Sequence, residues 1–218
     1  MKMHTAATGT LVVLGLMLTA CSGGDAEITA SHQSPNRTAD QAGRTQSPLE
    51  ETAAEELKAN ERLVEAILTS GIQLDYHPLA SPQEAMAAPL VVVGQIRSAR
   101  VTSGDAGPEV RLVVDVTRHV AGDEHLSTVE TAFNIGNGFD LAQRELDEVR
   151  GPVLLVVGNL LPPDGSDNPR LAYSHVDGAW FDVPGGIAGP YVRYDQMHED
   201  WPQASSVVEF ADALTKLP

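Results

Sequence analysis

The amino-acid sequence predicts a mainly β (α+β) protein, in which a small antiparallel, strongly curved sheet or barrel of about six strands carries an N-terminal and a C-terminal helix at its margins. Runs rich in β-branched residues recur between residues 90 and 183, and several alternate apolar with polar side chains, as half-buried strands do. Clusters of Gly, Pro, Asn and Asp separate these runs, which is typical of hairpins. The intervening helical patterns are too short for parallel crossovers, which disfavours a doubly wound α/β fold.

The first predicted helix begins at residues 47–50, which read Ser-Pro-Leu-Glu and form a capping box with proline at the first helical position. It is expected to continue to about Ser70, because Gly71 supplies a stop. Its apolar residues recur at helical spacing and are expected to pack on the protein's own core. A second capping box at residues 81–84 predicts a short helical turn. Residues 48–88 are therefore predicted to be a helical lead-in.

The predicted β region, together with the C-terminal helix, occupies residues 89–218. A turn cluster at 103–108 joins the first two strands into a hairpin. Asp177 and Gly178 lie between two strand-like runs, which predicts a second hairpin. The fourth run is apolar on both faces and is expected to be the most buried strand. The six predicted strands span residues 90–101, 110–117, 129–135, 153–157, 171–176 and 179–183.

Two helices and a turn complete the predicted architecture. A short amphipathic helix is expected from about Asp140 to Val149. Residues 184–190 are rich in Gly and Pro and predict a turn rather than a phosphate-binding loop, because no helical pattern follows the glycines. From about Pro202, apolar residues at helical spacing predict a final helix that closes the open end of the sheet.

The order of these elements has a counterpart among known proteins. The matching stretches are residues 91–96, the apolar strand after residue 152, and residues 177–181. With these features the domain is similar to small OB-like barrels in uncharacterised secreted proteins of Gram-positive bacteria. The resemblance implies a fold and no activity.

The N-terminal residues predict export and lipid attachment. Lys2 precedes an apolar run at residues 11–20, which is shorter than the roughly 20 residues that a membrane-spanning helix needs. Residues 18–21, Leu-Thr-Ala-Cys, resemble the lipobox of bacterial lipoproteins. The resemblance implies that Cys21 receives diacylglycerol, with acyl chains such as palmitate, that the chain is cut before it, and that the protein is anchored to the cell membrane on its extracytoplasmic side. The alternatives are a non-lipidated signal peptide with a chance cysteine and a buried free thiol.

Residues 1–20 are thus predicted to be a lipoprotein signal peptide, and residues 21–47 a lipidated cysteine followed by a disordered tether. From Ser22 to Ser47 the chain has Ile28 as its one large aliphatic residue, and such a composition cannot bury enough apolar surface to offset the entropy of ordering. Flexible-coil scaling gives this tether an average span of roughly 30 Å. The tether would lift the domain clear of the lipid head groups.

Charge and cysteine content exclude several classes of function. The formal net charge is −16, from 30 acidic and 14 basic residues. Nucleic acid is therefore not an expected partner, because binding it needs clustered Lys and Arg. Direct adhesion to anionic lipid head groups is disfavoured for the same reason. Cys21 is the only cysteine, so its lipidation leaves none for a disulfide.

The sequence contains no strong catalytic or metal-binding motif, and no catalytic residue, cofactor or metal ligand is predicted. Neither a Gly-x-Ser-x-Gly elbow nor a His-Glu-x-x-His zinc motif occurs. His119 and His125 lie close together across a turn, but ordinary surface histidines are favoured over a metal pair. Asp164, Asp167 and Asn168 offer oxygens in one loop, yet they lack the distal bidentate Glu of a calcium loop.

An aromatic cluster provides the one candidate contact surface. It consists of Trp180, Tyr191, Tyr194 and Trp201, which lie close together in sequence. Aromatic residues on loops often contact sugars or proteins. They also plug the ends of barrels, and this second interpretation is preferred.

Two hypotheses of function follow from different classes. The first is a non-catalytic, lipid-anchored binding or interaction module whose partner is an envelope protein, a cell-wall polymer or a small ligand. The second is an envelope enzyme of hydrolase type, whose carboxylates or histidines meet only after folding. The absence of strong motifs favours the first.

Overall fold

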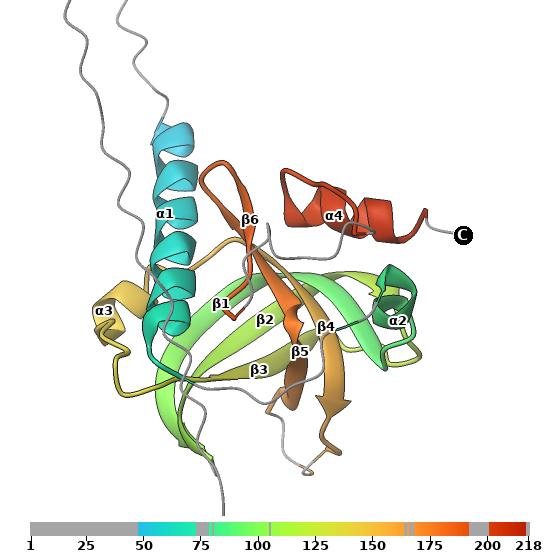
Figure 1. Cartoon of the computed structure of the whole chain (residues 1–218), viewed down its shortest axis with the longest axis horizontal. Helices are drawn as coiled ribbons and strands as arrows, with labels where there is room; N and C mark the ends of the chain where they lie inside the picture. Colours follow the sequence, from blue (N-terminus) through green and yellow to red (C-terminus); the bar gives the residue numbers. More distant parts are fainter. Residues whose placement is uncertain are drawn as a thin grey trace, which may run out of the picture. The chain divides into compact units, whose positions relative to one another are not determined.

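The computed structural model of the chain describes residues 48–72, 79, 81–104, 106–163, 165, 168–191 and 201–216. The predicted signal peptide, Cys21 and the tether lie outside the described residues. None of the described helices is long and apolar enough to cross a membrane. The described chain forms four helices and six strands (Figure 1): α1 (Pro48–Thr69), α2 (Pro82–Met86), β1 (Leu90–Gly104), β2 (Gly107–Ala121), β3 (Thr128–Asn134), α3 (Gln143–Leu146), β4 (Pro152–Leu160), β5 (Arg170–Val183), β6 (Gly186–Ala188) and α4 (Val207–Leu214).

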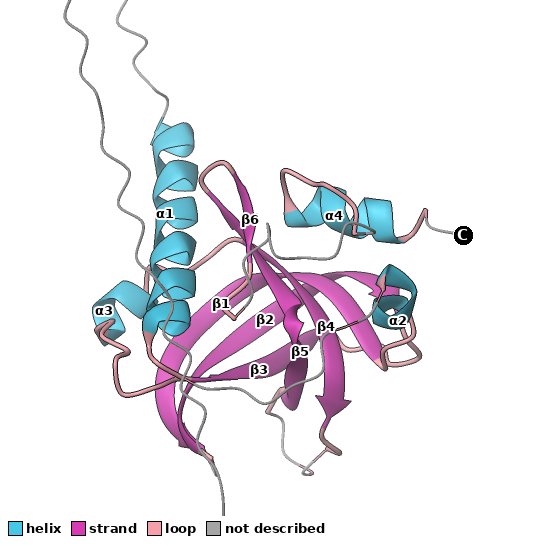
Figure 2. Cartoon of the chain, viewed as in Figure 1, coloured by secondary structure: helices cyan, strands magenta, loops and turns pink. Residues whose placement is uncertain are grey.

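The strands form one sheet that curls until two of its strands meet. Its order is β3-β2-β1-β4-β5-β6, with antiparallel neighbours throughout. A short parallel pairing of residues 129–131 in β3 with residues 170–172 in β5 closes the ring (Figure 2). A three-stranded meander, a helix and a hairpin that returns to both β1 and β3 is the arrangement of an OB-like barrel. The predicted class, a mainly β protein with one small, strongly curved antiparallel sheet of about six strands and helices beside it, is confirmed.

The strong curvature of β1 and β2 has a visible cause in their register. The pairing shifts at three places, one of them between Val93 and Gly94. A Cβ atom at Gly94 would lie 2.4 Å from Val114 Cγ1 and 2.6 Å from the carbonyl oxygen of Asp115. Only glycine permits this close approach, so the two strands coil tightly around each other here.

The first hydrophobic cluster fills the inside of the ring. Alternate residues of β1 and β4 point inward, among them Val92 and Leu155, and meet Phe133 of β3. Leu63 of α1 and Leu146 of α3 pack against this cluster and cover it. Figure 1 shows α1 and α3 together at one side of the ring. The predicted lead-in helix therefore packs on its own domain, as expected from its apolar spacing.

The second hydrophobic cluster lies on the opposite face of β1, β4 and β5. Val91 and Leu154 point outward into it, so the fourth predicted strand is buried on both faces as expected. α2 and α4 cover this cluster. The Val207 N–H at the start of α4 donates to Asp182 Oδ1 of β5 at 2.6 Å, which ties the helix to the sheet. The prediction that the final helix closes the open end of the sheet is therefore wrong, because α4 lies on a face.

Three sequence-based boundaries also need correction. The predicted helix at 140–149 shrinks to α3, and α4 begins after Ser206, whose hydroxyl accepts the Glu209 N–H at 3.2 Å. The predicted hairpin at Asp177 and Gly178 is wrong, because β5 runs through both residues and β6 is the sixth strand. A Cβ at Gly178 would lie 2.9 Å from the Val156 carbonyl oxygen, so this glycine serves a close strand contact within a register shift.

Candidate functional site

A pocket lies on the outer face of β1, β2 and β3, under the connection between β4 and β5. Its volume is about 410 Å³. Arg100, Arg111 and Arg170 line it together with Glu130, and apolar side chains complete its wall: Val113, Leu161, Pro162, Pro163, Pro169 and Leu171.

The β1–β2 register brings two of these arginines together. Arg100 and Arg111 are direct cross-strand partners on the outer face, while their sequence neighbours Ala99 and Leu112 point into the core. Like charges in this position repel and destabilise a sheet. The pair persists because β3 places Glu130 beside both arginines.

Two carboxylates neutralise and orient this pair. Arg100 Nη2 donates to Glu130 Oε1 at 2.5 Å, and Arg111 Nη1 lies 3.8 Å from the same oxygen. Arg111 Nε donates to Glu109 Oε1 at 2.5 Å, and the Glu109 side chain is only 2% exposed. Burial opposes the charge of Arg111, but the hydrogen bond and charge of Glu109, with the charge of Glu130, raise the pKa of the guanidinium above its ordinary value.

Arg170 fixes the wall of the pocket. Its Nε donates to the Leu161 carbonyl oxygen at 3.0 Å, and its Nη1 donates to Glu124 Oε2 at 2.9 Å. The Leu161 N–H in turn donates to the Leu171 carbonyl oxygen at 3.0 Å. The Arg170 side chain therefore joins the segment between β4 and β5 to the segment between β2 and β3.

A second pocket of about 380 Å³ adjoins the first and shares Asn168, Pro169 and Arg170 with it. Arg97 lines this pocket, and its Nε and Nη2 donate to both oxygens of Asp115. We call Arg97, Arg100, Arg111, Arg170 and Glu130, with the two pockets that they line, the arginine site.

The arginine site stands out against the charge of the chain. The whole sequence carries 14 basic residues and a net charge of −16, yet four of its arginines line these two pockets. Glu130 is the one acidic side chain in the two pocket walls. The two pockets therefore bring four guanidiniums together, and each guanidinium is paired with at least one carboxylate.

The predicted aromatic contact surface is corrected by the structure. Trp180 and Trp201 are buried beneath α4, where their rings lie 5.9 Å and 6.0 Å from that of Phe210. The Tyr191 hydroxyl donates to the Asn134 carbonyl oxygen at 2.9 Å, and burial raises its pKa well above the ordinary value. These three side chains serve packing because the clusters need large apolar groups. Tyr194 lies outside the described residues.

Other candidates from the sequence take ordinary structural positions. The His119 and His125 rings meet edge to face with centroids 4.9 Å apart, and no group of three metal-ligating side chains occurs in the described part of the chain. The predicted turn at residues 184–190 is confirmed only in part, because Pro184 and Gly185 join β5 to β6 while residues 186–188 form strand β6 itself. Asp164 and Asp167 lie outside the described residues, and Asn168 lines both pockets.

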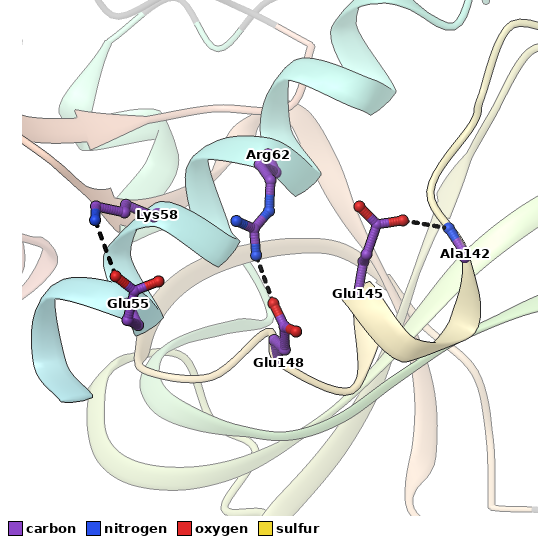
Figure 3. A network of polar contacts seen from close by, with 6 residues as sticks. All are labelled: Glu55, Lys58, Arg62, Ala142, Glu145 and Glu148. Atoms are coloured by element: carbon purple, nitrogen blue, oxygen red, sulfur yellow. Dashed lines mark hydrogen bonds and ion pairs between the residues drawn. The ribbon is translucent and has the colours of Figure 1, made fainter.

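Two acidic side chains, one on α3 and one just after it, make structural contacts. Figure 3 shows Arg62 of α1 donating to Glu148 Oε2 at 2.6 Å, and the Ala142 N–H donating to Glu145 Oε2 at 3.0 Å. The first contact joins α1 to the segment after α3, and the second caps α3. Neither carboxylate faces the arginine site, so this cluster has a structural role.

Two carboxylates of β5, the buried Asp177 and the partly buried Asp182, also bind backbone groups. Asp177 Oδ2 accepts the Leu79 N–H at 2.7 Å, and Asp182 Oδ1 accepts the Val207 N–H. Burial raises the pKa of both groups, against the opposing effect of these hydrogen bonds. Neither carboxylate lines the two pockets described above.

Sequence reasoning missed the arginine site. Arg100 and Arg111 occupy polar positions of alternating strands and look like ordinary solvent-facing residues. The usable signal was their symmetric placement about the predicted hairpin turn at 103–108, which makes them cross-strand partners. Arg170 gave no such signal, because only the closure of the ring brings it beside β3. No family model matches the chain, and neither the curated proteins nor the solved structures contain a significant match.

Proposed function

We propose that this chain is a lipid-anchored, extracytoplasmic binding module that holds a ligand of the cell envelope at the arginine site. The observation that carries the binding part is the pair of adjoining pockets lined by four arginines on a strongly acidic chain. The lipobox-like residues 18–21 support the anchor. The partner is an envelope component such as a cell-wall polymer or another envelope protein.

The geometry of the site supports binding in two ways. A volume of about 410 Å³ lies in the range of roughly 300–1,000 Å³ that is typical of ligand pockets. Glu109 and Glu130 hold the guanidiniums of Arg111 and Arg100 in place before any ligand arrives, which reduces the entropy lost on binding.

The position of the site on the fold gives further support by analogy. OB folds bind oligosaccharides and oligonucleotides on the face of strands 2 and 3, between the loops that follow strands 1 and 4. The arginine site occupies this face, under the β4–β5 connection. Fold analogy alone does not define a function, but here it agrees with the position of the charges.

The enzyme hypothesis needs two carboxyl groups, or a carboxyl and a histidine, that face each other in a cavity. In the first pocket the one acidic side chain is Glu130, which is held by two arginines. In the second pocket, His125 is accompanied by arginines and no carboxylate. We therefore propose binding without catalysis.

The anchor is tested by intact-mass analysis of the protein in the membrane fraction, beside a Cys21→Ala variant. We expect a mature N-terminus at Cys21 with added acyl mass, and loss of both acyl mass and membrane association in the variant. An unlipidated chain in the medium would refute the anchor.

Ligand binding is tested by sedimentation of the full chain carrying Cys21→Ala with a purified bacterial envelope fraction. We expect Arg100→Gln to weaken this association. Arg118→Gln is the matched control, because Arg118 of β2 is, like Arg100 of β1, a strand arginine paired with a carboxylate, here Asp212, but lies outside both pockets. Equal sedimentation of both variants and the parent would refute binding at the arginine site.

A further inference from the structure

The arginine site keeps hydrogen-bond donors for a ligand. In each of its four guanidiniums, one terminal nitrogen makes no hydrogen bond to any described residue. In Arg97 and Arg100 this is Nη1, and in Arg170 it is Nη2. In Arg111 it is Nη1, which lies 3.8 Å from Glu130 Oε1, beyond hydrogen-bond distance. The arginines that line the two pockets therefore keep several cationic N–H groups that no described residue accepts.

Such donors select oxyanions. A guanidinium binds carboxylate and phosphate oxygens through paired N–H groups, and these charge-assisted hydrogen bonds are stronger than neutral ones. The balancing carboxylates Glu109 and Asp115 are absent from the two pocket walls, so they compensate the arginines from outside the pockets. The negative charge of the remaining chain would repel an anion elsewhere and favour this one position.

The first pocket also favours a ligand that offers hydrogen-bond donors and apolar surface. Glu130 Oε2 receives no hydrogen bond from the described residues, and a carboxylate can only accept. Three prolines and two leucines also line this pocket. A bare phosphate or carboxylate satisfies the arginines alone, whereas a sugar ring adds hydroxyl donors for Glu130 and C–H faces for the prolines.

From this combination we infer that the arginine site binds an acidic saccharide, a sugar unit or short glycan that carries carboxylate or phosphate groups. The inference rests on the proposed binding function and adds the class of ligand. An acidic peptide fits less well, because its carboxylates and its N–H donors are separated by flexible side chains. In a sugar acid, hydroxyls and the oxyanion lie on one ring and fit a pocket of about 410 Å³ together.

The two adjoining pockets indicate more than one acidic unit. Arg170 and Asn168 line both pockets, while Arg97 belongs to the second and Arg100 to the first. A glycan with successive acidic units would place one oxyanion near each. The second contact then forms at a high effective concentration and increases the total affinity.

Isothermal titration calorimetry on the full chain in mild detergent tests this inference with defined probes. The acidic probes are trigalacturonate and glucose 6-phosphate, which distinguish a carboxylate from a phosphate ligand. Maltotriose is the neutral control, and a triglutamate peptide is the acidic non-sugar control. We expect at least one acidic sugar to bind about tenfold or more tightly than maltotriose, and trigalacturonate to bind more tightly than galacturonate monomer.

Substitutions connect this binding to the site. Arg100→Gln and Arg97→Gln are each expected to weaken the bound acidic sugar about tenfold, equivalent to about 1.4 kcal/mol, and Arg118→Gln to leave it unchanged. Arg97 and Arg100 are about half exposed, and Arg118 is 37% exposed. The three substitutions should therefore have similarly small effects on folding. Thermal unfolding of each variant verifies that it is folded.

Three results would overturn the inference. If maltotriose bound as tightly as the acidic sugars, charge would have no role in binding. If triglutamate bound more tightly than the acidic sugars, the site would be assigned to an acidic peptide. Binding of none of the probes would refute the saccharide assignment. In that case envelope sedimentation that still depends on Arg100 would keep the proposed binding function, so the two failures are distinguishable.

Discussion

Removal of the Phe210 ring tests how α4 is held on the sheet. Phe210 is fully buried in the second hydrophobic cluster, between Trp180 at 5.9 Å and Trp201 at 6.0 Å. Phe210→Ala removes this ring and both aromatic contacts, while the helix backbone gains a residue of higher helix propensity. The loss of packing should dominate, because propensity differences amount to less than about 1 kcal/mol.

The expected magnitude follows from three contributions. Burial of one Phe side chain contributes about 1.5–3 kcal/mol to the free energy of unfolding, and the substitution removes most of this contribution. The two ring contacts contribute about 0.5–1.5 kcal/mol each, and the cavity left behind adds a further penalty. Large-to-small Phe substitutions in cores lower the free energy of unfolding by about 3–5 kcal/mol, and we expect Phe210→Ala to fall in this range.

The assay uses the tryptophans themselves. The chain contains only two, and both lie against Phe210. Urea unfolding followed by tryptophan emission should show the lower stability, and acrylamide should quench the variant more than the parent. Val208→Ala on the same helix is the control, because Val208 is 47% exposed and its change should stay within about 0.5 kcal/mol. A loss below about 1 kcal/mol in Phe210→Ala, or strong quenching of the parent, would contradict the burial of this cluster.

Three further predictions concern the sheet and its charges. Glu109→Gln should lower the free energy of unfolding by about 2–4 kcal/mol, because it leaves the partly buried Arg111 charge with only a distant partner. In urea unfolding, adding Arg111→Met to this variant should restore part of the lost stability. If no stability is restored, the ion pair is contradicted. Asp182→Asn should remove a pH dependence of stability. The folded state raises the pKa of the Asp182 carboxyl above its ordinary value of 3.8, so it holds the proton more tightly than the unfolded state does. The parent should therefore lose stability relative to the variant as the pH rises from 3.8 through this raised pKa. Parallel stability curves from pH 3 to 8 would refute this. Gly94→Ala should destabilise by about 1–3 kcal/mol or more in thermal unfolding, because its Cβ would collide with β2 backbone; an unchanged melting temperature would show that the strands do not approach as described.

Local patterns in the sequence were sufficient for most of the elements. α1 begins at Pro48 as predicted, since its start depends only on nearby capping residues. The Ser81 hydroxyl accepts the Glu84 N–H at 3.2 Å, so the predicted N-cap of the second helix is confirmed. Period-two alternation located β1 and β2, because half-buried strands expose every second side chain.

Errors arose where a pattern served a contact distant in sequence. Asp177 and Gly178 look like a hairpin turn, but Asp177 binds the Leu79 backbone and Gly178 lies against Val156. Trp180 and Trp201 fit either a contact surface or, as preferred, a plug at the end of a barrel, but both lie under α4 on one face of the sheet. In each case the residue type agrees with two local structures, and only the packing partner distinguishes them.

By itself, the sequence determined the β-rich class, the position of the helical lead-in and the acidic character of the chain, because these follow from periodicity, capping and composition. It also contains the lipobox-like residues that predict an anchor at Cys21. The tertiary structure decided which polar residues gather. Arg100 and Arg111 meet through strand register, and Arg170 joins them because β3 and β5 pair and close the ring. The sequence determines which residues are charged, but the distances between these charges depend on the fold. Those distances define the arginine site.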